Sequence, residues 1–116
     1  MSIKIIVEPD ISHFGIESRI DDGIDRAWRA RANFYKLQCY DMDKLGKDWE
    51  HKWAYYNECM VTNDAISNAL NECQIRGMDL VCTLNDPGQA KRVYDLGVRN
   101  VKLASGQVVT DMFEAV

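Results

Sequence analysis

Two lysines occupy segments of the sequence that otherwise have the composition of buried strands. Lys36 lies within 33–38 and is followed two residues later by Gln38, while Lys102 lies within 98–104. Side chains two residues apart on a strand point to the same face, so Lys36 and Gln38 share a face. An ammonium group in a buried parallel strand is unfavourable unless an anionic partner lies near it. Two such lysines therefore predict a site that holds an anion.

Other polar residues follow the predicted strands at the edge where parallel βα folds place their sites. Glu8 ends the first strand, Thr83 ends the third, and Ser105 and Gly106 follow the fourth. Ammonium groups, a threonine hydroxyl and the N–H groups of a Ser-Gly turn favour a phosphate or a carboxylate. Glu8 can pair with a lysine, hold a substrate hydroxyl or move a proton. Spacing alone leaves open an internal ion-pair network without a ligand.

Local patterns place these residues in alternating strands and helices. Short runs of β-branched and aromatic residues predict strands at 3–8, 33–38, 79–83 and 98–104. Apolar residues at helical spacing predict helices that begin near Ile16, Thr62, Pro87 and Val108. The order βαβαβαβα predicts an α/β domain over 1–116, with a parallel sheet and right-handed crossovers.

Capping residues support the bounds of two of these helices. Thr62 is expected to cap the second helix, and Gly77 is expected to end it. Asp86 and Pro87 have the residue types of an N-cap and a first helical position, and Gly97 is expected to end that third helix. These signals fix where the predicted strands begin and end.

Two segments raise questions about packing. The segment 41–60 is longer than an ordinary βα loop. One face of an extra helix within it would carry Trp49, Trp53, Tyr56 and Met60. This face is interpreted as a hydrophobic lid packed on the domain, with a partner-binding surface as the alternative. The last helix is expected to point four residues inward: Val109, Met112, Phe113 and Val116.

Composition excludes several classes of protein. The chain has 116 residues, of which 47% are hydrophobic, so it can form one ordinary core. Its net charge is −4 without a basic block, which argues against binding to a nucleic-acid backbone. No apolar run reaches the ~20 residues of a membrane span, and MSIKIIVEPD lacks the pattern of a leader, so a cytoplasmic protein is expected. The four cysteines form no CxxC pair and are expected to be reduced and buried.

Three segments of the chain carry motifs of one family in the same order. The first is IIVE at 5–8 followed by SHFG at 12–15, the second is ANFYKLQ at 32–38, and the third runs without a gap over 77–107. They resemble IIAE with NHNG, ADAVKFQ, and GIxFLSTPFD with LGVPAYKIASGE. These motifs belong to the N-terminal half of the catalytic barrel of the sialic acid (N-acetylneuraminate) synthase family. That family condenses phosphoenolpyruvate with an N-acyl amino sugar.

The resemblance implies roles for individual residues. The phosphate and carboxylate of phosphoenolpyruvate would be held by Lys36, Thr83, Lys102, Ser105 and Gly106. The reacting centre would be lined by Glu8, Gln38 and Asp86, and His13 and Tyr40 would lie in loops near the second substrate. The anion site inferred from strand parity agrees with these roles.

The chain also departs from the family pattern. Ser12 and Phe14 replace the two asparagines of NHNG, and Pro9-Asp10 replaces Ile-Gly, so a different second substrate is expected. The family's two metal-binding histidines have no counterpart, because neither His13 nor His51 matches them. No cofactor is therefore expected from this chain alone. A divalent metal, Mn²⁺ or Mg²⁺, is expected only if another chain supplies the missing half.

Four βα units correspond to half of an eight-stranded barrel. A half TIM barrel leaves two sheet edges and its inner face open, so we expect a homodimer that completes or covers it. A doubly wound, flavodoxin-like sheet is the alternative fold. Three functions remain open: a synthase that uses phosphoenolpyruvate to form a C–C bond, a non-catalytic module that binds a phosphorylated metabolite or nucleotide, and an assembly protein.

Overall fold

The computed structural model describes residues 2–44, 53–104 and 110–116. Within them a single sheet contains the parallel strands β1 (Ile6–Val7), β2 (Phe34–Cys39), β3 (Asp79–Leu84) and β4 (Asn100–Leu103). The strands lie in the order of the sequence, β1-β2-β3-β4. A flavodoxin-like sheet has the order 2-1-3-4-5, so that alternative is wrong. Sequential parallel strands alternating with helices are the arrangement of half a TIM barrel.

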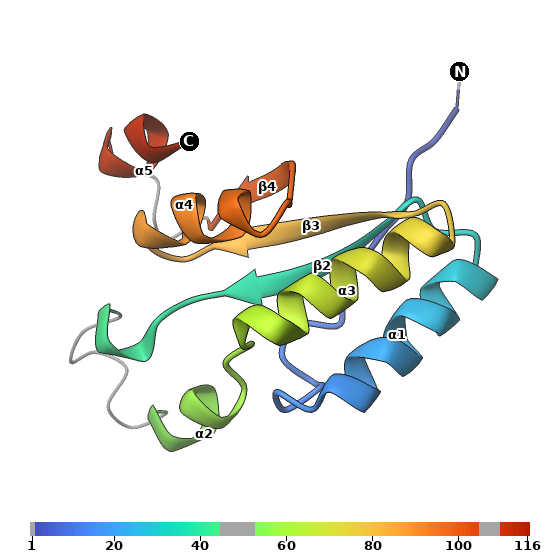
Figure 1. Ribbon diagram of the computed structural model, residues 1–116, viewed down its shortest axis with the longest axis horizontal. Coiled ribbons are helices and arrows are strands. Elements are labelled where there is room, and N and C mark those ends of the chain that lie inside the picture. The colour runs from blue at the N-terminus through green and yellow to red at the C-terminus, as the bar shows by residue number, and fades with distance from the viewer. Residues whose placement is uncertain (1, 45–52, 105–109) are drawn as a thin grey trace.

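Helices cover one face of this sheet (Figure 1). The longer helices are α1 (Glu17–Arg29), α3 (Asn63–Ile75) and α4 (Gly88–Asp95). The shorter elements are the 3-10 helix η1 (Met42–Lys44), α2 (Trp53–Glu58) and α5 (Thr110–Ala115). α1 and α3 lie side by side, and α3 contacts both β2 and β3.

Strand parity explains why the two faces of the sheet differ. On β2, Tyr35, Leu37 and Cys39 point toward α1 and α3 and belong to the main hydrophobic core. Their neighbours Lys36 and Gln38 point to the opposite face, because side chains alternate along a strand. The same alternation applies to β3, so the polar positions of both strands meet on the face away from the helices.

The capping signals of α3 are confirmed. The Thr62 Oγ1 accepts a hydrogen bond of 3.0 Å from the Ala65 N–H. Gly77, just after α3, has a φ of 70°, and Gly97, just after α4, has a φ of 101°. Residues other than glycine rarely adopt such angles, so both glycines end their helices as expected. The chain then turns directly into β3 and β4.

The N-cap expected at Asp86 is wrong. α4 begins at Gly88 after Pro87, and no side chain caps it. The Asp86 carboxylate instead accepts a hydrogen bond of 3.1 Å from the Gln89 side chain. Asp86 lies one residue before the N-cap position, which Pro87 occupies. Its carboxylate therefore contacts the Gln89 side chain and not the backbone N–H groups at the start of the helix.

The last helix packs differently from the expectation. α5 begins at Thr110, and Phe113 and Val116 are 57% and 61% exposed. The expectation that these two residues point inward is therefore wrong, and the short helix contacts α4. Val109 lies outside the described residues.

The lid interpretation of 41–60 is confirmed for the part that the structure describes. Tyr56 and Met60 pack against a second hydrophobic cluster, which consists of Ile11, Tyr40, Met42 and Cys59. This cluster lies beyond the end of β2 and joins the loop after β1 to α2. Trp49, expected on the same face, lies outside the described residues.

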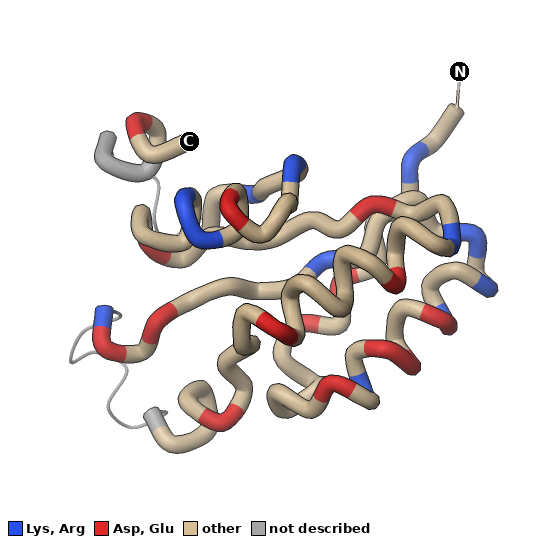
Figure 2. The backbone as a smooth tube through the Cα atoms, in the orientation of Figure 1, with Lys and Arg blue, Asp and Glu red and all other residues tan. Residues whose placement is uncertain are grey.

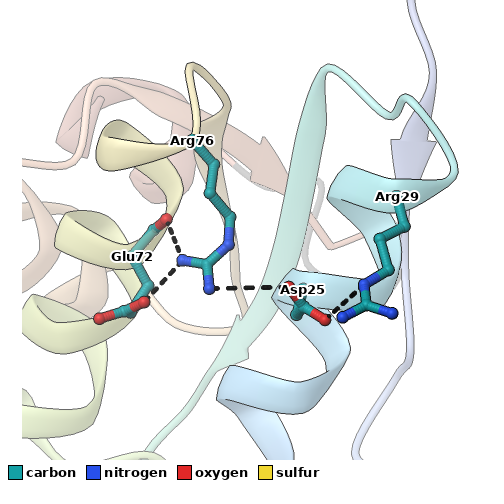
Figure 3. A network of polar contacts seen from close by, with 4 residues as sticks. All are labelled: Asp25, Arg29, Glu72 and Arg76. Carbon is teal, nitrogen blue, oxygen red and sulfur yellow. Dashed lines mark hydrogen bonds and ion pairs between the residues drawn. The ribbon is translucent and has the colours of Figure 1, made fainter.

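Charged side chains on the outer helices pair with one another. α1 carries both acidic and basic residues, whereas α3 carries acidic residues and is followed directly by Arg76 (Figure 2). Asp25 accepts from Arg29 at 2.9 Å and lies 3.9 Å from Arg76, which also pairs with Glu72 at 2.6 Å (Figure 3). The network joins α1 to α3, although partly exposed pairs each contribute only about 0–1 kcal/mol.

Composition led to expectations about the cysteines and about membrane-spanning segments. The cysteines Cys39, Cys59, Cys73 and Cys82 are buried free thiols, as expected. Within the described ranges, no helix has the length and apolar character needed to cross a bilayer.

Gly23 of α1 allows the helix to approach the sheet closely. A Cβ atom at this position would lie 2.5 Å from the Tyr35 hydroxyl oxygen. We predict that Gly23→Ala lowers the free energy of unfolding by about 1–3 kcal/mol, as overpacking does. Without the clash, alanine in a helix would instead raise it by about 0.5–1 kcal/mol.

Urea unfolding followed by circular dichroism measures this change. Tyr35→Phe removes the hydroxyl oxygen. Gly23→Ala should therefore lower the free energy of unfolding by less in the Tyr35→Phe background than in the wild type. A stabilising effect of Gly23→Ala in the wild-type background would contradict the close approach.

Candidate functional site

An ion pair between β1 and β2 forms the centre of the candidate site. The Lys36 Nζ lies 2.7 Å from the Glu8 Oε1. Only 3% of the Lys36 side chain is exposed, compared with 43% of the Glu8 side chain. Tyr35 pairs with Val7 across the two strands, so Glu8 follows β1 at the level of Lys36. The expectation that a buried lysine needs an anionic partner is confirmed for Lys36.

A second ammonium group lies near this ion pair. Lys102 acts on both Glu8 and Lys36. The hydrogen bond from Lys36 lowers the pKa of Glu8, and the charge of Lys102 lowers it further. Burial lowers the pKa of Lys36, and nearby Lys102 adds to this effect while Glu8 opposes it. Two cations and one anion leave the cluster with an excess positive charge.

Thr83 lies between the second lysine and Gln38 in the register of the sheet. It pairs with Gln38 on β2 and with Lys102 on β4. The Thr83 side chain is buried, and its Oγ1 has no hydrogen-bond partner among the described residues. A buried hydroxyl without a partner is uncommon in folded proteins. Its position beside two lysines is suited to an anionic ligand.

The face of the sheet away from the helices is hollow. The hollow has a volume of about 660 Å³. The residues lining it include Ile6, Phe34, Val81, Glu8, Lys36 and Lys102. On β1 and β2 the apolar members, Ile6 and Phe34, precede the charged members, Glu8 and Lys36, which lie toward the carboxyl ends of these strands.

Gln38 joins the cluster and brings Asp10 with it. The Gln38 Nε2 donates a hydrogen bond of 2.5 Å to the Asp10 Oδ1, and Gln38 also lowers the pKa of Glu8. Asp10 lies in the loop after β1 and was not among the expected site residues. The signal that could have identified it is the replacement of a family glycine by an acidic residue near Glu8.

The described contacts of Asp86 lie outside the cluster of Glu8, Lys36 and Lys102. It is 4% exposed, its Oδ2 accepts from Gln89, and its Oδ1 lies 3.9 Å from the Lys44 Nζ. These contacts connect the start of α4 to η1 after β2. None of the contacts described for Asp86 involves Glu8, Lys36 or Lys102.

His13 and Tyr40 support the loops around the site. His13 is 3% exposed, and its Nδ1 accepts a hydrogen bond of 2.9 Å from the Gly15 N–H. Burial lowers the pKa of His13, against the effect of the Asp10 charge. The Tyr40 hydroxyl donates to the Tyr56 carbonyl oxygen at 2.7 Å, and burial raises the pKa of Tyr40. Both side chains therefore hold loop structure.

The remaining expectations concern the residues after β4 and a metal site. Ser105 and Gly106 lie outside the described residues. Among the residues that are described, no group of three or more His, Cys, Asp and Glu side chains is placed to hold a metal ion. The described groups are the ammonium groups of Lys36 and Lys102, the carboxylates of Glu8 and Asp10, the Gln38 amide and the Thr83 hydroxyl, and two ammonium groups among them suit an anion better than a metal ion.

Comparisons with known proteins identify relatives of this chain. A family model described as the NeuB family matches residues 23–114. A search of curated proteins finds no match. The similar solved structures include an N-acetylneuraminic acid (sialic acid) synthetase from Leptospira borgpetersenii serovar Hardjo-bovis in complex with citrate. It has a TM-score of 0.86 and 21% identity, over 91% of this chain and 37% of that one.

Two other solved structures have the same fold. A putative spore coat polysaccharide biosynthesis protein E from Chromobacterium violaceum has a TM-score of 0.82 and 18% identity, over 98% of this chain and 38% of that one. Spore coat polysaccharide biosynthesis protein SpsE from Bacillus subtilis has a TM-score of 0.70 and 24% identity, over 89% and 29%. The present chain thus spans less than two fifths of each of these proteins.

The resemblance expected from the sequence is confirmed by these comparisons. The family match begins within α1 and ends within α5, so it includes three of the four strands. The structural likeness to sialic acid synthetase extends over 91% of the chain, with a TM-score of 0.86. This chain belongs to the NeuB family.

Proposed function

We propose that this chain binds a phosphorylated anion, phosphoenolpyruvate or a similar compound, at the cluster of Glu8, Lys36, Thr83 and Lys102. The observation that supports this most directly is a second ammonium group, that of Lys102, near the ion pair of Lys36 and Glu8, where it lowers the pKa of both partners. An oxyanion placed beside Lys102 and the Thr83 hydroxyl would balance the second positive charge. It would also give the buried Thr83 Oγ1 a hydrogen-bond partner.

The alternative is an internal ion-pair network without a ligand. One lysine and one glutamate would be enough for such a network, as in the 2.7 Å pair of Lys36 and Glu8. Lys102 adds a cation that lowers the pKa of Lys36 and therefore opposes its charged form. A second cation in this place is unfavourable for the fold alone, and it favours the ligand-binding interpretation.

Condensation of phosphoenolpyruvate with an N-acyl amino sugar is the catalytic alternative within the family. In that reaction Glu8 and Gln38 would contact the reacting groups, because they adjoin the lysines. Asp86 has its described contacts with Lys44 and Gln89 instead. Binding is therefore the function that the described residues support best, and catalysis would need groups beyond them.

Thermal unfolding with and without ligand tests the proposed site. A ligand at 100 times its Kd adds about 2.7 kcal/mol to the free energy of unfolding, so phosphoenolpyruvate should raise the Tm of the wild-type protein. Lys102→Ala should abolish this rise because it removes the more exposed of the two ammonium groups. Lys91→Ala is the matched control, since the Lys91 side chain is 80% exposed on α4 and pairs with Asp95.

Screening should include sugar phosphates and nucleotides as further phosphorylated ligands. An equal rise in Tm for the wild type and Lys102→Ala would contradict the assignment of the site. The absence of a response to every anion would leave the internal network as the better explanation.

The pKa of Lys36 predicts how binding depends on pH. Burial lowers this pKa below the ordinary lysine value of 10.5, so Lys36 loses its proton at a lower pH than an exposed lysine. Anion affinity should therefore fall as the pH rises through that lowered value. Glu8 raises the pKa of Lys36, so in Glu8→Gln the fall should begin at a lower pH. Titration calorimetry from neutral to alkaline pH measures this shift, and identical profiles for both proteins would contradict it.

We also propose that a second copy of the chain covers the hollow face. Ile6 on this face is 53% exposed, and within the described sheet β1 and β4 each pair with one strand only. A two-fold axis along the axis of the completed barrel would join β4 of one copy to β1 of the other. The result would be eight parallel strands without a free edge.

Light scattering tests this second proposal. The wild type at about 100 µM should have the mass of a dimer, because burial of apolar surface drives association. Ile6→Lys should give a folded monomer, since it places a charge in the covered face. Ile75→Lys, on the outer surface of α3 where Ile75 is 67% exposed, should leave the dimer intact. A folded wild-type monomer at this concentration would contradict the proposal.

A further inference from the structure

We propose that Asp10 determines specificity at the anion site. It favours a phosphorylated ligand that also carries an ammonium group, and it disfavours one that also carries a carboxylate. This inference rests on the proposed anion site and names the class of ligand that the site prefers. Three properties of Asp10 support it: the backbone of the loop after β1, the contacts of the side chain and its charge.

The backbone at Asp10 is better suited to glycine. Its φ is 57°, in the left-handed region that is unfavourable for a residue with a side chain. The family pattern has glycine at the same place after the strand. Aspartate and asparagine are the residues with side chains that tolerate this region best. The chain therefore adopts a glycine-like turn and adds a carboxylate to it.

The turn directs this carboxylate toward the site. The Asp10 Oδ1 accepts a 2.5 Å hydrogen bond from the Gln38 Nε2. Gln38 also lowers the pKa of Glu8, so its amide group lies near both carboxylates. The groups at this end of the site are therefore hydrogen-bond acceptors: two carboxylates and the Gln38 carbonyl oxygen. A ligand group that contacts them must be a donor.

Asp10 and Glu8 differ in whether a cation neutralises their carboxylate. The Glu8 carboxylate has the Lys36 ammonium group 2.7 Å away. Asp10 forms no ion pair with any cation of the described residues, and its side chain is exposed. The site is thus positive at Lys36 and Lys102 and negative at Asp10. This arrangement matches a short molecule with a phosphate at one end and an ammonium group at the other.

Two phosphate monoesters of similar length separate this effect from anion binding itself. Phosphoethanolamine carries an ammonium group, whereas propyl phosphate carries a methyl group in its place. For the wild type we expect phosphoethanolamine to have a Kd about fivefold lower, which corresponds to about 1 kcal/mol. Asp10→Asn should reduce this ratio to about one and leave the Kd of propyl phosphate unchanged.

Phosphoenolpyruvate provides the opposite test, because it carries a carboxylate. Removal of the Asp10 charge should lower its Kd by about threefold, since like charges no longer repel. Asparagine retains the shape of the aspartate side chain and tolerates the left-handed backbone, so Asp10→Asn should fold normally. Asp10→Gly, which restores the family residue, should give the same changes in selectivity even if the asparagine variant unfolds. Titration calorimetry measures all of these constants.

The outcomes distinguish this inference from the function on which it rests. If both monoesters bind the wild type with the same Kd, or if the ratio is unchanged in both Asp10 variants, the role of Asp10 is wrong while the anion site stands. If neither monoester nor phosphoenolpyruvate binds, the anion site itself is wrong. Lys102→Ala should weaken both monoesters by similar factors, because it acts on the phosphate they share.

Discussion

The burial of the Lys36 ammonium group is the constraint on which the site depends. An unpaired cation in a sheet with 3% exposure is strongly unfavourable, so the fold must supply an anion. Glu8 supplies it from the end of β1, at 2.7 Å. This requirement favours the pairing of β1 with β2, a contact that involves only two residues of β1 in the ladder. The charged pair and the strand pairing therefore support each other.

The same sheet separates stability from function by the parity of its strands. Residues of β2 and β3 that point toward α1 and α3 are aromatic or aliphatic and form the core. The residues between them point to the hollow, and include Lys36, Gln38 and Thr83. Substitutions on the hollow face can thus leave the core undisturbed. This separation is consistent with a family fold that is retained at 18–24% identity to the solved structures.

The loop after β1 shows how a family scaffold accommodates new residues. Asp10 and Phe14 both have positive φ values, of 57° and 54°, and neither is glycine. Buried His13 and the cluster around Ile11 hold the loop in place from the inside. The cost of the backbone is offset by this packing, which leaves the Asp10 carboxylate near Gln38. In this loop the chain departs from the family pattern at several neighbouring positions.

The order of strands and helices, and the face on which the β2 site residues lie, could be predicted before the fold was known, because periodicity and capping are local properties. Thr62 and the shared face of Lys36 and Gln38 are examples. The partners of the polar side chains could not be predicted in this way. Asp86 contacts η1 and α4 rather than the lysines, and Asp10 contacts Gln38. A local pattern contains no information on the distance between segments far apart in the chain, so these contacts depend on how the strands and loops pack together.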